Sequence, residues 1–280
     1  MAADSQVRRY DMALIHANFF SETLGMCVSC DVVLPQRATR QIGMAASAAD
    51  GAYPTLWLLH GASDDHTIWQ RRTSIERYAA PLGLAVVMPA VSLSAYANMA
   101  HGGRYYDYVS QELPAIMRSM FPLSDRREDN FISGLSMGGA GCMKIGLANP
   151  ENYAAIGCFS AGAINRHAQL SPERAARMMM THGTTDPDDL KGTVEDVLGS
   201  AQRILDEGLP CPRIFHSIGS EDFLLDSAHE TRDFFTALPG NPFDYHYEEH
   251  PGAHTWEYWD EHIQDFLRFI GLERLSDVRN

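Results

Sequence analysis

The chain has 280 residues, of which 45% are hydrophobic, and its formal net charge is −14, with 36 acidic against 22 basic side chains. This size and composition suit one large α/β domain. The acidic balance argues against a nucleic-acid partner and against an anionic membrane surface. No apolar run approaches the roughly 20 residues needed to span a bilayer, so we also expect no membrane partner.

The N-terminal segment and the cysteines indicate the compartment. Arg8 and Arg9 are followed by no sustained apolar core, so we recognise no signal peptide. Five scattered cysteines, an odd number, fit reduced thiols, and we expect a cytoplasmic protein. Cys27 and Cys30 form one C-x-x-C, but no second pair of ligands lies nearby. We therefore predict no metal site.

Apolar runs separated by turn signals predict strands that alternate with helices along the chain. Residues 1–22 carry only short apolar patches, and residues 36–53 and 90–104 are predicted loops. The predicted strands cover 24–34, ending at Pro35, then 55–59, 84–88, 131–132, 153–159, 212–218 and 243–249. The predicted helices cover 68–80, 106–120, the segment from Ser136 to Asn149, 172–180, 193–207, 227–238 and 256–270. This alternation predicts an α/β fold with a mostly parallel central sheet and helices on both faces.

The segment Gly134-Leu135-Ser136-Met137-Gly138 matches the pattern G-x-S-x-G. It lies between a short apolar run and a small-residue helix that Asn149-Pro150 ends. In α/β-hydrolases this strand–turn–helix holds a serine on a strained turn at the top of the sheet. Gly134 and Gly138 would stand where side chains collide in so sharp a turn. The pattern alone is common by chance, and its setting makes it specific.

Residues 163–208 differ in character from the rest of the chain. They are polar and acidic, with short helical patterns. We interpret them as a cap-like insertion over the sheet, within a single α/β-hydrolase domain that covers residues 1–280. The run Met178 to Met180 could line an acyl pocket, but helix packing is the favoured interpretation.

Ser136 can act as a nucleophile only if a base takes its proton and a carboxylate orients that base. In α/β-hydrolases these groups follow in the order Ser, acid, His, each past the C-terminal end of a strand. Asp222 follows the 212–218 strand, and His254 follows the 243–249 strand. The order and the spacing predict Ser136, Asp222 and His254 as a catalytic triad.

Other residues compete for the role of base. His216 and His246 lie inside predicted strands, whereas His250 also stands at a strand end. His254 is favoured because it follows Pro-Gly in a loop and directly precedes a helix that two tryptophans would pack.

Other residues also compete for the role of acid. Asp226 and Glu221 are the alternatives to Asp222, which is favoured by its place in the tight turn after Gly219-Ser220.

Two backbone N–H groups are predicted to stabilise an oxyanion. One belongs to Met137, directly after the nucleophile, and the other to Ala62, in the His60-Gly61-Ala62-Ser63 loop after the 55–59 strand. Trp69, a little further along the chain, is a candidate substrate-binding residue.

Several segments together resemble a known branch of the α/β-hydrolases. The segments LLHGASDDHTIW, YYDYVSQELP, GLSMGGAG, IGSEDF and HPGAHTWEYWD resemble esterase-D-type enzymes, especially bacterial tributyrin or acetyl esterases. S-formylglutathione hydrolases and feruloyl esterases are relatives. The resemblance covers most of residues 20–270 and is weakest over 163–208. It implies the same triad, short-chain acyl esters as substrates, no cofactor, and a homo-oligomer such as a dimer or tetramer.

We therefore expect a serine carboxylesterase that hydrolyses acetyl to butyryl esters through an acyl-enzyme. Three alternatives stay open: an S-formylglutathione hydrolase acting on a thioester, an acyltransferase in which an alcohol replaces water, and a non-catalytic binding protein on the same fold.

Overall fold

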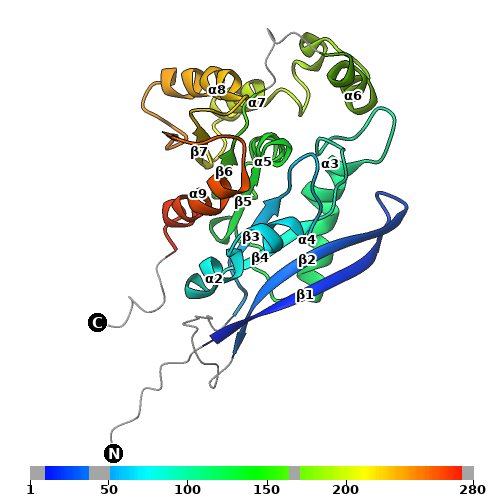
Figure 1. Ribbon diagram of the computed structural model, residues 1–280, viewed down its shortest axis with the longest axis vertical. Coiled ribbons are helices and arrows are strands. Elements are labelled where there is room, and N and C mark those ends of the chain that lie inside the picture. The colour runs from blue at the N-terminus through cyan, green and yellow to red at the C-terminus, as the bar shows by residue number, and fades with distance from the viewer. Residues whose placement is uncertain (1–9, 38–50, 164–170, 273–280) are drawn as a thin grey trace, which may run out of the picture.

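The computed structural model describes residues 10–37, 51–163 and 171–272. The strands in these ranges form one eight-stranded sheet in the order β1-β2-β4-β3-β5-β6-β7-β8 (Figure 1). The strands are β1 (Tyr10–Ser21), β2 (Met26–Arg37), β3 (Thr55–Leu59), β4 (Ala85–Pro89), β5 (Asn130–Leu135), β6 (Ala155–Phe159), β7 (Arg213–Gly219) and β8 (His246–His250). From β4 through β3 to β8 every neighbouring pair is parallel, which confirms the predicted mostly parallel sheet.

The helices occupy the segments between the strands. They are α1 (Ile68–Arg72), α2 (Ile75–Ala79), α3 (Tyr105–Asp107), α4 (Leu113–Met120), α5 (Met137–Ala148), α6 (Pro172–His182), α7 (Val197–Glu207), α8 (Leu225–Ala237) and α9 (Trp256–Phe269). The predicted helix 68–80 is interrupted before Ser74, whose N–H donates to Asp260 on α9. The predicted helix 106–120 is present, with a π-helical segment joining α3 to α4. None of the helices in the described ranges combines the length and the apolar composition required to cross a membrane.

The sequence analysis missed β1 and placed the end of β2 too early. β1 pairs with β2 along its whole length, from Tyr10 opposite Arg37 to Ser21 opposite Met26. Pro35 lies inside β2, although proline cannot donate to a sheet. Pairing between β2 and β4 stops at Val33, so Pro35 has a neighbouring strand, β1, on one side only. No strand pairs with Pro35 on its other side, and the N–H that proline lacks leaves no sheet hydrogen bond unmade there.

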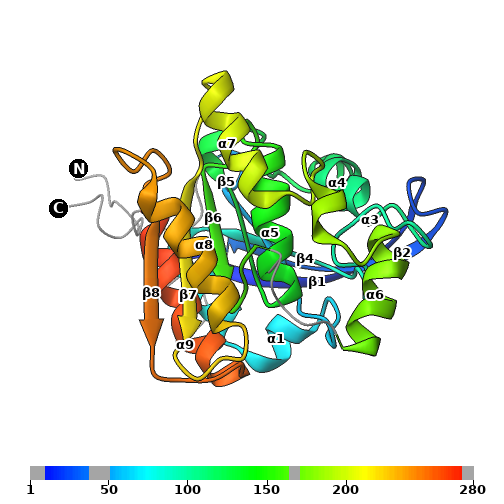
Figure 2. The ribbon, with the colours of Figure 1, turned by 90° about the horizontal axis from the view of Figure 1, so that it is seen from above.

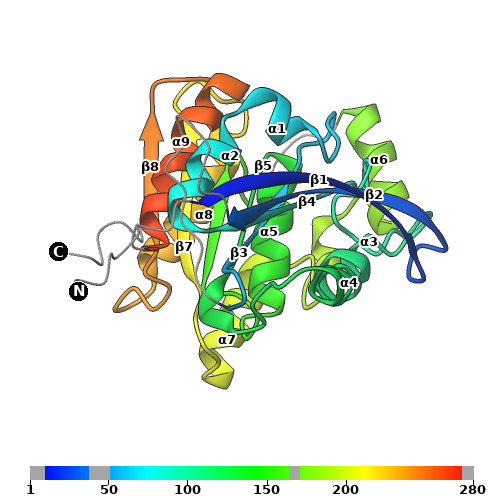
Figure 3. The ribbon, with the colours of Figure 1, turned by 90° about the horizontal axis from the view of Figure 1, so that it is seen from below.

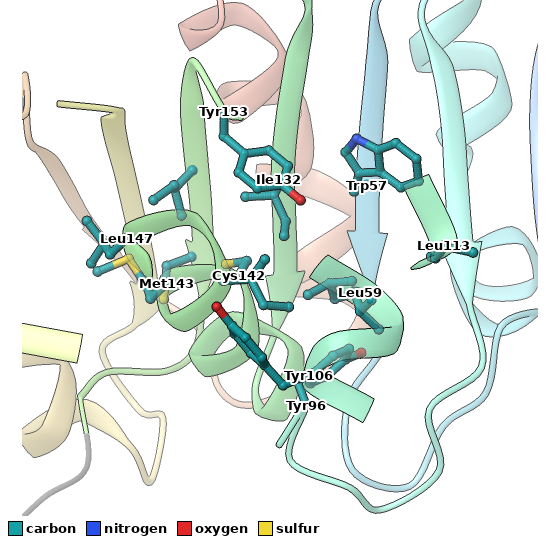
Figure 4. Packing of buried hydrophobic residues seen from close by; sticks show 14 of the residues in the cluster. Trp57, Leu59, Tyr96, Tyr106, Leu113, Ile132, Cys142, Met143, Leu147 and Tyr153 are labelled. Carbon is teal, nitrogen blue, oxygen red and sulfur yellow. The ribbon is translucent and has the colours of Figure 1, made fainter. Parts of the chain in front are cut away.

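Side chains alternate between the two faces of each central strand, and helices bury both faces. Trp57 and Leu59 of β3 point to a core shared with α4, α5, α7 and α8. Leu56 and Leu58 point to a second core shared with α1, α2 and α9. Figures 2 and 3 show these helices on the two sides of the sheet, and Figure 4 shows the first core packed around α5.

The two helices of the 163–208 insertion have different surroundings. α7 belongs to the helix layer, because Val197, Ala201 and Ile204 lie in the core beside α5. α6 lies away from the sheet, and its last turn accepts hydrogen bonds from the 100–101 backbone at Thr181 and Met180. Of these two helices, only α7 packs in the core beside α5, and the cap role of the insertion stays a prediction.

A buried ion pair joins the insertion to α5. Lys144, which is only 4% exposed, places its Nζ 2.5 Å from Oε2 of Glu195 and donates to the carbonyl of Ala95 at 2.8 Å. Burial lowers the pKa of Lys144, and the Glu195 carboxylate opposes that shift. The Glu195 carboxylate neutralises the Lys144 ammonium, which would otherwise be a buried charge without a counter-charge.

We predict that Glu195→Gln destabilises the protein by about 3 kcal/mol, because it leaves the Lys144 ammonium buried without a counter-charge. Urea unfolding would measure the loss. The double variant Lys144→Met/Glu195→Leu should recover most of it. Glu207→Gln, which breaks an exposed pair with Arg203, serves as the control and should cost less than about 1 kcal/mol. Equal losses in Glu195→Gln and Glu207→Gln would contradict the assignment.

Candidate active site

Ser136 occupies a strained turn between β5 and α5. Its backbone angles are φ 53° and ψ −118°, a conformation that residues with a Cβ rarely adopt. Its N–H donates to the carbonyl of Phe159 in β6 at 2.8 Å, which fixes the turn against the neighbouring strand. The serine side chain lines two cavities at the carboxyl ends of the parallel strands.

The two glycines of the G-x-S-x-G segment are required by close backbone contacts. A Cβ on Gly134 would lie 2.5 Å from the carbonyl oxygen of Gly138. A Cβ on Gly138 would lie 2.6 Å from the carbonyl oxygen of Leu59. Both distances are too short for real atoms, so only glycine lets α5 approach the ends of β3 and β5 this closely. The steric role predicted for both residues is confirmed.

The His60–Ser63 loop lies beside the serine turn. A Cβ on Gly61 would approach Leu135 to 2.7 Å and the Cβ of Ser136 to 3.8 Å. Ala62 and Ser136 line the same cavity of about 540 Å³. Met137 is the first residue of α5, and an N–H at this position has no acceptor within its helix. The proximity agrees with the predicted oxyanion donors, whose role stays a prediction.

Two buried side chains hold that loop. The His60 ring contacts the carbonyl oxygen of Gly61 at 2.8 Å through Nδ1 and accepts the Val91 N–H at 3.1 Å through Nε2. Burial lowers the pKa of His60, which favours the neutral ring that this pair of contacts requires. Trp69 donates its indole N–H to the carbonyl of Leu59 at 3.0 Å.

The prediction that Trp69 binds substrate is wrong. The side chain is only 1% exposed and packs edge-on against Trp256, with ring centroids 5.2 Å apart. Trp256, together with Trp259, lines the cavity beside Ser136 instead. Trp69 therefore supports the loop and the cavity wall from below.

Asp222 and His254 form a hydrogen-bonded pair at the ends of β7 and β8. The His254 Nδ1 lies 2.8 Å and 3.0 Å from the two carboxylate oxygens of Asp222, which is 5% exposed. Burial alone would raise the pKa of Asp222. Hydrogen bonds from His254, the Leu224 N–H and Ser160 outweigh burial, and they hold this pKa below its usual value. The carboxylate is therefore ionised beside the ring.

The competing residues have other surroundings. His250 contacts Glu248 through Nε2, and its ring stacks on His262. Glu221 and Asp226, the alternative acids, are both exposed. In the described part of the chain the Ser136 hydroxyl makes no hydrogen bond to His254, although both line one cavity. Such contacts often tighten only when substrate binds.

Ser160 and Trp259, which the sequence analysis did not assign to the site, help to hold Asp222 in place. The Trp259 indole N–H donates to Ser160 Oγ at 2.9 Å, and Ser160 interacts with the Asp222 carboxylate. The Trp259 ring also meets His254 edge-on, with ring centroids 5.0 Å apart. One tryptophan therefore contacts the base directly and the acid through Ser160.

The larger cavity, about 660 Å³, extends from Ser136 beneath α6. Met178 lines it, whereas Met179 and Met180 are exposed, so the favoured interpretation that the methionine run packs the helix is wrong. Phe223, 75% exposed, lines both cavities. The charged side chains of its wall come from α6 and α8: Arg174, Arg177, Asp226 and Glu230.

Comparison with known proteins places the chain in a family. The sequence profile of the Esterase family matches residues 21–270. The chain belongs to the Esterase family. It is 27% identical to an acetyl esterase of Caldicellulosiruptor saccharolyticus over 273 residues, covering 95% of this chain and 100% of that protein. These matches support an ester hydrolase of the α/β-hydrolase fold, as the motif resemblance implied.

Two solved structures from Staphylococcus aureus are also similar to this member of the Esterase family. A fluorophosphonate-binding serine hydrolase superposes with a TM-score of 0.79 at 33% identity, covering 94% of this chain and 99% of that chain. An S-formylglutathione hydrolase superposes with a TM-score of 0.77 at 34% identity, with the same coverage.

We predict that Ser160→Ala lowers kcat for ester hydrolysis about tenfold, equivalent to ~1.4 kcal/mol, because a carboxylate that orients the base loses a hydrogen bond. Losing this hydrogen bond should raise the pKa of Asp222, because Ser160 is one of the groups that hold that pKa down. The acid limb of the kcat/KM profile should therefore move to higher pH. Steady-state kinetics between about pH 5 and 9 would measure both effects.

Trp259→Phe is the matched variant, since it keeps an aromatic ring at this position and removes the N–H that donates to Ser160. We expect a smaller loss of kcat in this variant. Wild-type rates and an unmoved pH profile in both variants would show that Ser160 does not position the acid.

Proposed function

We propose that the protein is a serine carboxylesterase in which Ser136, His254 and Asp222 act as the triad. The observation that carries the proposal is the contact of His254 Nδ1 with both carboxylate oxygens of an ionised Asp222, beside a serine on a strained turn. These features lie at the carboxyl ends of β5, β7 and β8, where the fold collects functional groups. Membership in the Esterase family supports the same chemistry.

The mechanism follows from the hydrogen bond to Asp222. Because Nδ1–H donates to the carboxylate, His254 presents Nε2 as the proton acceptor. Ser136 Oγ attacks the ester carbonyl and transfers its proton to Nε2, and the carbonyl oxygen becomes an anion beside the Met137 and Ala62 N–H groups. His254 then protonates the leaving alcohol, and the acyl group stays on Ser136. Water, deprotonated by the same ring, hydrolyses this acyl-enzyme and restores the serine.

We propose short acyl groups, acetyl to butyryl, as the acyl part of the substrate. The lining of the cavity that Ser136 shares with Ala62 includes Leu93, Trp256 and Trp259, which suit a small apolar group. The similarity to an acetyl esterase over the whole chain favours the same range. The larger cavity beneath α6, with its charged wall, is then left for the alcohol part.

An S-formylglutathione hydrolase is the second candidate. It is favoured by the 34% identity to such an enzyme and by the charged wall of the larger cavity, which suits a charged leaving thiol. The two candidates share every step except the leaving group. A kcat/KM for S-formylglutathione far above that for p-nitrophenyl acetate would favour the thioesterase, and the reverse would favour the esterase.

We further propose a cytoplasmic homo-oligomer, dimer or tetramer, that needs no cofactor. The cysteines are free in the described residues, which suits a reducing compartment. Acyl transfer, the remaining catalytic alternative, would form a new ester when an alcohol is added to the assay.

We predict that Ser136→Ala lowers kcat on the order of 10⁴-fold or more for p-nitrophenyl acetate and butyrate, because no other group can carry the acyl intermediate. Wild type should turn over both esters faster than the octanoate. The control is Ser119→Ala, an exposed serine on α4 that should leave the rates unchanged. If Ser136→Ala retained wild-type activity, the proposed nucleophile would be wrong.

A further inference from the structure

A cluster of two histidines and two carboxylates lies between β8 and α9, outside the proposed triad. It consists of Glu248, His250, His262 and Asp265, and one donor atom from each lies within 4.8 Å of all the others. His262 is only 8% exposed, and the other three side chains are half-buried. The cluster is therefore partly withdrawn from water.

The periodicities of a strand and a helix bring these residues together. Glu248 and His250 are two apart on β8 and so point to the same face of the sheet. His262 and Asp265 are three apart on α9 and so share one face of the helix. α9 packs on that face of the sheet, where Phe215 of β7 contacts Phe266.

The contacts inside the cluster form two matched pairs. His250 Nε2 lies 3.1 Å from Oε2 of Glu248, and His262 Nδ1 lies 2.8 Å from Oδ2 of Asp265. The two imidazole rings stack with centroids 4.4 Å apart and planes only 5° from parallel. The two carboxylates are thereby held close to one another, because the donor atoms of both pairs lie within 4.8 Å of one another.

We propose that this cluster is a binding site for a divalent first-row transition metal ion, with zinc as the best fit. Two imidazole nitrogens and two carboxylate oxygens are a common donor set for zinc, and the two negative charges balance the ion. Donors of a tetrahedral zinc site lie about 3.3 Å apart at bond lengths near 2.0–2.2 Å. The two contacts of 2.8 and 3.1 Å already approach that spacing, so the ion has to draw only the wider pairs together.

The site was missed in the sequence because its ligands do not form a compact motif. The sequence analysis predicted no metal after weighing Cys27 and Cys30, and it considered His250 only as an alternative base. His262 and Asp265 lie on α9, and in the sequence this segment indicates only an amphipathic helix. The four residues become a set only when α9 folds back on β8.

The position of the cluster gives the ion a structural consequence. His250 and His262 stand on either side of residues 251–255, the segment that carries His254. The His250 carbonyl accepts the Ser220 N–H at 2.8 Å, and the Gly252 carbonyl accepts the Glu221 N–H at 2.8 Å. A metal ion would therefore tie β8 to α9 across the segment next to the Asp222 turn. Zinc binding by this cluster does not depend on the proposed triad. An effect of the ion on catalysis does depend on the triad, and so rests on the proposed function.

The test uses the full chain, purified without a histidine tag and dialysed against EDTA and then metal-free buffer. Zinc alone is added, and bound zinc per chain is measured by equilibrium dialysis with elemental analysis. We expect one zinc per chain and a rise in Tm of about 5 °C at saturating zinc, since the ion binds only the folded state. The double variant His250→Gln/His262→Gln should lose both.

The control is His229→Gln, which removes a histidine that pairs with Glu249 on the opposite face of β8. It should bind zinc as the wild type does. Asp265→Asn, a milder change at a half-buried position, should weaken zinc binding at least tenfold and keeps the test valid if the double variant fails to fold. Absence of zinc binding by the wild type, or equal binding by the wild type and Asp265→Asn, would overturn the proposal.

Discussion

The close approach of α5 to the ends of β3 and β5 is the constraint on which the candidate site depends. Gly134 and Gly138 have no room for a Cβ, and Ser136 between them is held at a positive φ. A helix packed this tightly starts directly at the residue after the serine, so its free N–H groups face the space above the sheet. Any larger side chain at either glycine would push the helix away and release the turn.

 The parallel sheet brings the other residues of the candidate site next to this turn. β3, β5, β7 and β8 all end at the same edge of the sheet, so the segments that follow these strands meet there. Ala62 follows β3, Ser136 follows β5 and His254 follows β8. Residues so distant in sequence become neighbours because parallel strands place their carboxyl ends at one edge. The buried side chains beneath, Trp69 and Trp259 among them, then hold the loops in place.

The sequence predicted the parts of the fold that local patterns determine. Continuous apolar runs such as Thr55–Leu59 identify central strands, because both of their faces are buried. β1 was missed because only one of its neighbours is a strand and its side chains alternate between half-buried and exposed, with Leu14 and Phe20 facing solvent. Trp69 and Ser160 were misjudged or missed because their roles depend on tertiary contacts, with Leu59 and with Trp259, that no sequence spacing reveals.

The most direct test of the account is covalent labelling of the nucleophile. The protein would be treated with a fluorophosphonate, digested and mapped by mass spectrometry, since Ser136 Oγ would displace fluoride from phosphorus and keep the phosphonyl group. The account predicts one adduct, on the peptide that contains Ser136, and much slower labelling of His254→Ala. Labelling at another serine, or no adduct with the folded protein, would contradict the claim that this turn presents an activated serine.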